Sequence, residues 1–508
     1  MNENNTSPSA EPTLTTRTLS GAKWSAIARV GQQVIALGTT SVLARLLTPA
    51  DYGLVGMCAF FLGLASIFRD FGMSSAVIQQ KRVEEPLPST AFWLNAIFGA
   101  TTCAVCMLAA PLVARFYHTP ALTGIMRALS LSFIISSLGS VPSALLSRSM
   151  SFRKIAATEI ATAVASSAAG ISFALSGQGV WSLVAANLTG AATEVVAFAV
   201  QSRWRPKWRF DFAQIRAIFG FSANLSGFQV LNYFARNADN MLLGRYVGAS
   251  ALGFYQYAYT LMLYPLDNVS ATLGRVLFPA FSQVQDDNER FRSAYTRVCS
   301  VIAAITFPMT LGMMAVAGPL IDVLLGPKWH PAARLLTILA PVGLVQSIVT
   351  TGGHIYMAKG RTDWMIRWGI FSAPLLVASF IVGLPWGTEG VAISYAAFFF
   401  ALAPAALAIP FKLIDLSLWQ FVKRLLPTLG YTLVMFIVTV AVRIGLEQIG
   451  LRPSAILPAC VTVGVIVYVG LVVWQKPPFL HDLALLGGHR LPAPVVAWLA
   501  RHDPDGSS

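Results

Sequence analysis

The chain has 508 residues, of which 55% are hydrophobic and only 11% are charged, and its formal net charge is +14. Soluble proteins carry about 25% charged residues, so a soluble chain of this composition could not cover its surface with polar groups. Together with a mean hydropathy of +0.63, these values exclude soluble enzymes, disordered scaffolds and secreted disulfide-rich domains, and they indicate an integral membrane protein.

The chain begins with a Ser-, Thr- and Asn-rich segment, residues 1–21, which has no hydrophobic stretch followed by a cleavage site. We expect a cytoplasmic tail there and no signal peptide. A membrane-spanning helix needs about 20 mostly apolar residues. Segments of this kind predict an all-α membrane protein with about 14 transmembrane helices. They are 22–44, 50–68, 90–114, 122–146, 155–176, 180–201, 216–246, 250–279, 294–324, 332–358, 363–383, 388–411, 424–446 and 455–474.

The predicted helices group into larger parts. We expect an N-terminal six-helix lobe (22–201), a basic cytoplasmic linker (202–215), a C-terminal six-helix lobe (216–411), two additional transmembrane helices (412–474) and a cytoplasmic tail (475–508). Within that tail, residues 479–499 are weakly amphipathic and are expected to lie along the membrane surface.

Basic residues are distributed unevenly between the two sides of the membrane. With a cytoplasmic N-terminus, 24 of the 36 Lys and Arg residues fall in cytoplasmic segments, 8 on the opposite side, and 4 inside or beside apolar runs. This bias follows the positive-inside rule and predicts that both termini are cytoplasmic. We therefore expect no nucleic-acid binding, and the basic, Trp-rich segment 203–209 is a better fit to anionic lipid headgroups.

The sequence repeats itself at an offset of 200 residues. Leu43 and Arg45 are followed by Gly53, and Leu243 and Arg245 are followed in the same spacing by Gly253. Six predicted helices separate the two copies, so both lobes have the same orientation in the membrane, as in transporters built from parallel repeats. Each Arg also fits an anchor at a helix end, and each Gly fits a tight connection, so these positions are gate or structural candidates.

Several short motifs carry a resemblance to a known family. They are ARLLTPADYG at 44–53, Phe71-Gly72, DNMLLGR at 239–245, ALGFYQYAY at 251–259, GPKW at 326–329 and AKGRTD at 358–363. Over residues 20–475 the chain resembles the polysaccharide transporter family. Its members are the Wzx-type lipid-linked oligosaccharide flippases of the MOP superfamily, which also contains the MATE drug exporters. The likeness is greatest to the colanic-acid-exporter branch.

The resemblance implies two six-helix lobes that face each other across a V-shaped central cavity, with two extra C-terminal helices. It implies that the protein moves undecaprenyl-pyrophosphate-linked repeat units from the cytoplasmic to the periplasmic leaflet by alternating access. Exopolysaccharide or lipopolysaccharide would then be assembled outside. The expected location is the bacterial inner membrane. The expected partners are the lipid-linked oligosaccharide, the bilayer, and the polymerase and export machinery of the same pathway.

Cations inside apolar helices are the substrate-binding candidates, because a sugar–pyrophosphate head cannot cross hydrocarbon unaided. Arg29 lies beside Gln32 in the first helix, and Arg236 lies near Asn232 and Asn240 in the seventh. One Arg from each lobe would form a clamp, since guanidinium binds phosphate through paired hydrogen bonds. The alternative is that Arg236 pairs with Asp239. A further candidate is Tyr255, which is suited to stacking on a sugar or to the aromatic belt of the membrane interface.

Acidic residues in the predicted spans are candidates for coupling transport to protons or sodium. We assign this role to Glu194, Asp239 and Asp267, although each is equally suited to a hydrogen bond with a neighbouring helix; Glu159 lies near the start of the fifth helix. Gate salt bridges or helix-end anchors are expected of charged residues at the cytoplasmic helix ends, namely Arg69, Asp70 and Arg275.

Enzymatic signatures are missing from the sequence. It contains no Walker A, H-E-x-x-H or G-x-S-x-G motif, and Cys103 and Cys106 are better explained by helix packing than by a metal site. We expect a non-enzyme with no catalytic residue, metal or cofactor. Two alternatives stay open. One is a MATE-like exporter of drugs or metabolites with an acid-lined cavity. The other is a membrane glycosyltransferase or polymerase, which would need catalytic acids on a large loop.

Overall fold

The computed structural model describes residues 14–69, 87–208, 230, 232–270, 281, 284–475, 477 and 479–480. Side chains are described at these positions apart from 14–23, 25, 26, 68, 69 and 270. Every regular element in these ranges is a helix, and ten segments are long and apolar enough to cross a membrane. The predicted all-α membrane fold is therefore confirmed.

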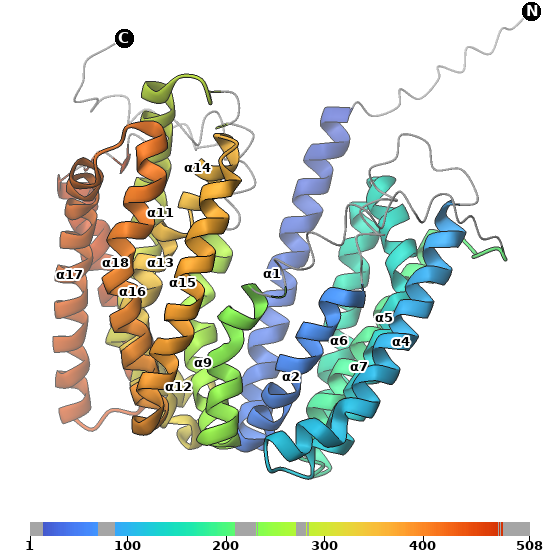
Figure 1. The fold of residues 1–508 in the computed structure, drawn as a ribbon. Coiled ribbons are helices and arrows are strands. Elements are labelled where there is room, and N and C mark those ends of the chain that lie inside the picture. The colour runs from blue at the N-terminus through green and yellow to red at the C-terminus, as the bar shows by residue number, and fades with distance from the viewer. Residues whose placement is uncertain are drawn as a thin grey trace, which may run out of the picture. The chain divides into compact units, whose positions relative to one another are not determined.

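The chain divides into two compact units, Met1–Asn237 and Ala238–Ser508. The labelled helices of the first unit correspond to the first six predicted spans (Figure 1), but α1 begins at Leu14, inside the segment 1–21 that we expect to be a tail. They are α1 (Leu14–Leu46), α2 (Pro49–Arg69), α4 (Leu87–Phe116), α5 (Leu122–Arg148), α6 (Phe152–Leu175) and α7 (Trp181–Ser202).

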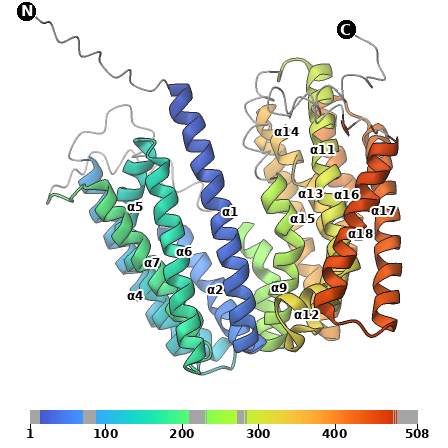
Figure 2. The ribbon, with the colours of Figure 1, turned by 180° about the vertical axis from the view of Figure 1, so that it is seen from behind.

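Small residues hold the helices of the first unit together. Helices α4 and α5 pack against each other, as do α6 with α7 and α1 with α6 (Figure 2). At Gly170 of α6, an added Cβ would lie 3.1 Å from Cβ of Ala186, and at Gly190 of α7 it would lie 3.2 Å from Cβ of Ser166. Between apolar helices in a membrane the hydrophobic effect gives no net attraction, so close backbone approach at such residues supplies the packing energy.

The helices of the second unit follow the remaining predicted spans, in part as shorter pieces. A helical stretch, 232–246, contains the boundary between the two units. The labelled helices are α9 (Ala249–Pro265), α11 (Asn288–Ala315), α12 (Ala317–Leu324), α13 (Pro331–Val349), α14 (Gly352–Ala358), α15 (Thr362–Gly383), α16 (Gly387–Phe411), α17 (Leu418–Gln448) and α18 (Pro453–Gln475). Helix α9 continues into a π-helical turn, Leu266–Ser270.

The core of the second unit is a cluster of buried apolar side chains contributed by α11, α13, α14, α16 and α17. Phe291 and Tyr295 of α11 pack against Phe411 and Phe421, with ring centroids of Tyr295 and Phe411 5.7 Å apart. Helices α17 and α18, the two helices beyond the twelve of the predicted lobes, pack on each other and α17 packs on α11 (Figure 1).

The predicted span 294–324 differs from the structure at its start and in its middle. The span predicted at 294–324 begins earlier, at Asn288, because the Asp287 carboxylate caps the helix by accepting from the backbone N–H groups of Glu289 and Arg290 at 3.0 Å. It is then interrupted at Val316, where α11 ends and α12 begins. The first turns of α11 contain charged residues, so hydropathy does not show that the helix begins there.

The beginning of the helical stretch 232–246 is fixed to α2 within the first unit. The Tyr233 hydroxyl lies 3.2 Å from the carbonyl oxygen of Ala59 and 3.1 Å from that of Phe60, and can donate to either. This contact requires a glycine opposite the tyrosine, because a Cβ at Gly63 would lie 2.0 Å from the Tyr233 oxygen.

Candidate functional site

The first resemblance motif forms a helix cap. Thr48 precedes α2, Pro49 is its first residue, and Asp51 follows in its first turn. The Asp51 carboxylate accepts from the backbone N–H and the hydroxyl of Thr48 at 2.8 and 2.7 Å, while the Thr48 hydroxyl accepts from the Asp51 N–H at 3.3 Å. This reciprocal pair is a capping box, so this part of the motif ends α1 and starts α2.

The repeat of the motif uses a different device at the equivalent turn. Arg45 lies in the last turn of α1, and Arg245 lies in the last turn of the stretch 232–246, 5.4 Å above the Tyr246 ring. In the second copy Gly248, with a φ of 105°, precedes α9 where Thr48 precedes α2. Gly53 and Gly253 are buried in the first turns of the following helices. The 200-residue offset therefore relates equivalent helix junctions.

The later motifs are also turns. In GPKW, Trp329 is fully buried, with its ring centroid 4.6 Å from that of Tyr257 on α9. In AKGRTD, Gly360 has a φ of 66°, and the Lys359 ammonium donates to Asn288 Oδ1 at 2.6 Å. These contacts connect helix ends to the body of the second unit and give the motifs a structural role.

Charged side chains on three neighbouring helices of the first unit lie near one another. The lower ends of α1 and α6 are joined by a cluster of Leu43, Leu47 and Ala174, with Leu183 of α7 against it. At a rise of 1.5 Å per residue, Arg29 lies about 21 Å along α1 from Leu43, and Glu159 lies about 22 Å along α6 from Ala174. On α7, Glu194 lies about 17 Å from Leu183.

These three residues form what we term the Arg29 cluster. Glu159 interacts electrostatically with Glu194 and with Arg29. Glu159 is half-buried, whereas Arg29 and Glu194 are exposed. Gln32 lies one turn from Arg29 and is half-buried. Two carboxylates beside one guanidinium can hold or release a proton and can compete with another anion for the guanidinium.

Glu159 is one of the acids considered for ion coupling in the predicted spans, although the final assignment leaves it out. Its relation to Glu194 could have been inferred from the short turn between Leu175 and Trp181, since the two residues lie at nearly equal distances from that turn on antiparallel helices. A neighbouring contact agrees with this register, because a Cβ at Gly190 of α7 would lie 3.7 Å from Thr162 Cγ2 of α6.

Asp239 and Tyr255 meet in the interior of the second unit. The Tyr255 hydroxyl donates to the Asp239 carboxylate at 3.0 Å, and the Asn240 backbone N–H donates to the same carboxylate at 2.8 Å. Asp239 is 2% exposed and Tyr255 is 0% exposed. Tyr255 also stacks on Tyr259, with ring centroids 5.9 Å apart. Its hydroxyl and ring are therefore both engaged within the protein.

The remaining candidates lie in different surroundings. Arg236 and Asn232 are exposed on the stretch 232–246, and Asn240 is half-buried. Asp267 is exposed in the π-helical turn after α9. Asp70, Arg275 and the Arg69 side chain lie outside the described residues, as do Phe71-Gly72, the first part of the predicted span 216–246 and most of the C-terminal tail. In the described ranges, no three His, Cys, Asp or Glu side chains are grouped to hold a metal ion.

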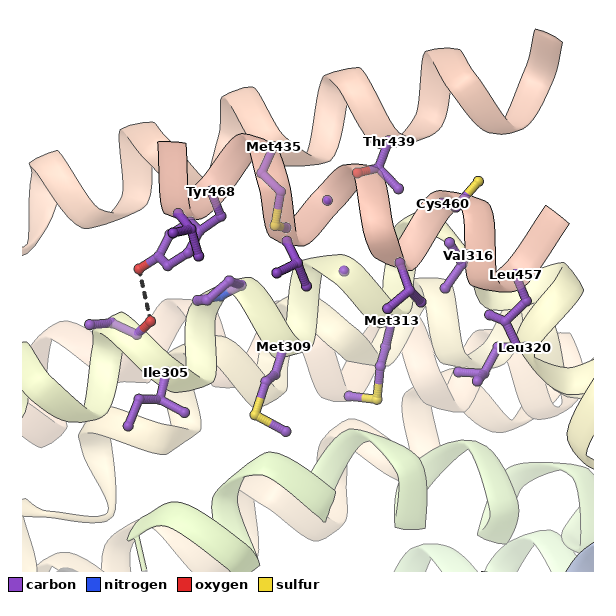
Figure 3. A pocket seen from close by; sticks show the side chains of 17 residues that line it. Ile305, Met309, Met313, Val316, Leu320, Met435, Thr439, Leu457, Cys460 and Tyr468 are labelled. Carbon is purple, nitrogen blue, oxygen red and sulfur yellow. Dashed lines mark hydrogen bonds between the residues drawn. The ribbon is translucent and has the colours of Figure 1, made fainter. Parts of the chain in front are cut away.

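The second unit contains an apolar cavity of about 470 Å³ between α11, α12, α17 and α18 (Figure 3). Met309 and Met313 of α11 line one wall, and Met435 and Thr439 of α17 line another. The Tyr468 hydroxyl of α18 donates to the Ala304 carbonyl at 2.8 Å at one end of the cavity (Figure 3). A cavity with these walls suits an alkyl or isoprenoid chain.

Curated relatives share most of their length with this chain. It is 29% identical to the lipopolysaccharide biosynthesis protein WzxC of Escherichia coli K12, over 81% of this chain and 86% of that protein. It is 24% identical to the succinoglycan biosynthesis transport protein ExoT of Rhizobium meliloti, over 96% and 99% of the two chains. It is 21% identical to Agl15 of Haloferax volcanii, described as a probable low-salt glycan biosynthesis flippase, over 71% and 76%.

Solved structures show the same fold at low sequence identity. The lipid II flippase MurJ in an inward closed conformation superposes with a TM-score of 0.70 at 14% identity, over 89% of this chain and 98% of that one. An inward-facing MATE multidrug transporter of the MOP superfamily gives a TM-score of 0.58 at 14% identity, over 76% and 94%. The profile of the family described as "Polysaccharide biosynthesis protein" matches residues 42–334. Because that match spans more than half of the sequence, the chain belongs to this polysaccharide biosynthesis family.

Proposed function

We propose that this protein moves polyprenyl-pyrophosphate-linked oligosaccharides from the cytoplasmic to the periplasmic leaflet by alternating access. The family, the fold shared with MurJ, and relatives described as a biosynthesis transport protein and a glycan biosynthesis flippase support this function. The observation that carries it is the Arg29 cluster, a charged group on three membrane helices. Such groups cost free energy in hydrocarbon and are kept where a polar cargo passes.

The substrate sets the physical requirement. A pyrophosphate and its sugars lose their hydrogen bonds to water in the bilayer, and each unsatisfied polar group costs several kcal/mol. The transporter must therefore replace water with fixed polar groups along the path. Arg29 would bind the pyrophosphate through paired hydrogen bonds, and Gln32, Asn232 and Asn240 would bind sugar hydroxyls.

The two carboxylates of the Arg29 cluster would regulate this binding. Without substrate, Glu159 and Glu194 neutralise Arg29; when pyrophosphate arrives, it replaces them as the partner of the guanidinium. The displaced carboxylates then carry excess negative charge and would take up a proton or a sodium ion, which couples transport to an ion gradient. Asp239 and Asp267 stay candidates for a second coupling site, and Arg236 for the second arm of the clamp.

The lipid part of the substrate needs no polar path. Its chain can stay in the bilayer or enter the apolar cavity between α11, α17 and α18. We assign the protein to the bacterial inner membrane with both termini cytoplasmic, where it would act upstream of a polymerase. A MATE-like drug exporter is the rival on the same fold, and a membrane glycosyltransferase or polymerase is the rival enzyme.

The experiment replaces the chromosomal gene with variants and measures both polymer export and the leaflet that holds lipid-linked repeat units. Arg29→Gln should stop export and leave repeat units in the inner leaflet, whereas Arg29→Lys should restore part of the export. Arg127→Gln, an exposed arginine on α5 outside the cluster, is the matched control. Normal export by a deletion strain without a related transporter would refute the function. Drug resistance conferred by expression, with normal polymer, would favour the exporter.

A further inference from the structure

The first residues after α7 form a non-helical segment. Helix α7 ends at Ser202, and the next residue, Arg203, adopts a left-handed backbone conformation with a φ of 54° that turns the chain away from the helix axis. Residues 203–207 then have no helical structure. We term residues 203–208, with the sequence RWRPKW, the basic segment.

The basic segment is fixed to the start of α4 by backbone and ring contacts. The Lys207 backbone N–H donates to the hydroxyl of Ser89 at 3.0 Å, and the Trp93 indole N–H donates to the Lys207 carbonyl at 3.1 Å. The rings of Trp93 and Trp208 stack with centroids 4.1 Å apart. Trp204 packs against an apolar cluster that contains Ala91. The segment therefore has one defined conformation.

In this conformation the cationic side chains of the basic segment face away from the protein. Burial alternates along the segment. Trp204 and Pro206 are partly buried against the protein, while Arg203, Arg205 and Lys207 are exposed. The three cations therefore form a row on the exposed side of the segment.

The row has little negative charge of its own. Between residues 87 and 208 the chain contains only two acidic residues, Glu159 and Glu194, and both belong to the Arg29 cluster. A fourth cation lies beside the row, because the Lys154 ammonium donates to the carbonyl of Gln201 at 3.1 Å. The described surroundings thus concentrate positive charge at this end of α6 and α7.

We infer that the basic segment is a preformed binding site for the headgroups of anionic phospholipids. The ends of α4 and α7 mark the level of the membrane interface, since both helices are long and apolar enough to span the bilayer. Trp208 is 86% exposed and stacked on Trp93, which places an indole pair at the depth that Trp prefers. At this depth the cations directly beside the indole pair can contact lipid phosphates.

The test measures lipid binding to the purified full-length protein by native mass spectrometry, with phosphatidylglycerol as the anionic probe and phosphatidylcholine as the neutral one. The variant Arg203→Gln/Arg205→Gln/Lys207→Gln, which we call the loop variant, removes the three positive charges of the basic segment. Each basic residue near an anionic lipid contributes about fivefold in affinity, so this variant should bind phosphatidylglycerol about 100-fold more weakly. Its phosphatidylcholine binding should not change.

A matched control removes the same charge from cations that already have carboxylate partners. These are Arg290, Arg334 and Arg361, which pair with Asp287, Glu389 and Asp363 at 3.2, 3.0 and 3.0 Å. Their triple Gln variant should keep wild-type phosphatidylglycerol binding, and Arg203→Lys/Arg205→Lys should keep it too. Equal loss in the loop and control variants, or undiminished binding by a monodisperse loop variant, overturns the proposal. If the loop variant binds phosphatidylglycerol as the wild type does, the proposal fails, and binding of an acidic protein to the segment would not rescue it.

Discussion

The buried contact between Tyr255 and Asp239 makes a quantitative prediction about stability. Tyr255→Phe removes one hydroxyl from a fully buried ring without changing its shape, so no cavity forms. The Asp239 carboxylate then keeps only the Asn240 backbone N–H among its two described donors. A hydrogen bond to a charged group contributes about 1.5–3 kcal/mol to folding, so the free energy of unfolding should fall by that amount.

Tyr295→Phe is the matched control in the same unit. Tyr295 is also fully buried, but its hydroxyl shares a hydrogen bond of 2.8 Å with the neutral hydroxyl of Thr351. A neutral bond contributes about 0.5–1.5 kcal/mol, so the control should cost about half as much. The assay is unfolding of the purified proteins in mixed micelles at increasing concentrations of denaturing detergent, followed by circular dichroism.

Asp239→Asn completes the cycle, because it keeps an acceptor oxygen and removes the charge. In that background Tyr255→Phe should cost only about 0.5–1.5 kcal/mol. An equal cost of Tyr255→Phe with Asp239 and with Asn at this position would refute the charged pair. A stable Asp239→Asn variant without transport, beside a transporting Tyr255→Phe variant, would in turn support ion coupling at Asp239.

Three further predictions follow from close contacts. Gly63→Ala should destabilise the protein by about 1–3 kcal/mol through its clash with Tyr233, and Tyr233→Ala should remove that penalty; a fully stable Gly63→Ala variant would contradict the contact. Trp329→Ala should cost about 3–5 kcal/mol in the same unfolding assay, and a loss below 1 kcal/mol would contradict its burial. Gly312→Leu should fill part of the apolar cavity and slow transport at normal expression. Gly312→Ala should not slow it, because its Cβ would lie at an ordinary contact distance of 3.8 Å from Met435. Equal transport rates of the two variants would show that transport does not use the cavity.

The helices themselves could be predicted because a bilayer of fixed thickness demands long apolar segments. The predicted span 388–411 lies within one residue of α16 at its start and matches it at its end. Interruptions do not show in hydropathy, because the break at Val316 lies within an apolar run; the signal there is Gly318-Pro319, a dipeptide typical of turns and helix starts. The early start at Asn288 depends on a cap by Asp287 that hydropathy does not register.

The orientation of side chains was the main limit on predicting the site. Membrane helices are apolar on several faces, so the pattern around Tyr255 could not distinguish a cavity wall from the interior, where the structure places it. In the sequence Arg29 and Glu194 are isolated charges, and only the packing of α6 against α1 and α7 relates them through Glu159. Motifs such as GPKW carry the resemblance to the family, but in the structure they form turns and not a binding site. Turn geometry also restricts which residues a position can hold.

The most direct measurement reconstitutes the purified protein into proteoliposomes that contain a polyprenyl-pyrophosphate-linked oligosaccharide. A membrane-impermeant sugar-modifying enzyme then reports how much of the lipid reaches the opposite leaflet. The wild type should equilibrate the two leaflets, Arg29→Gln should not, and Arg29→Lys should do so more slowly. No movement by the folded wild type, with or without a proton or sodium gradient, would contradict the proposed activity, and full movement by Arg29→Gln would contradict its site.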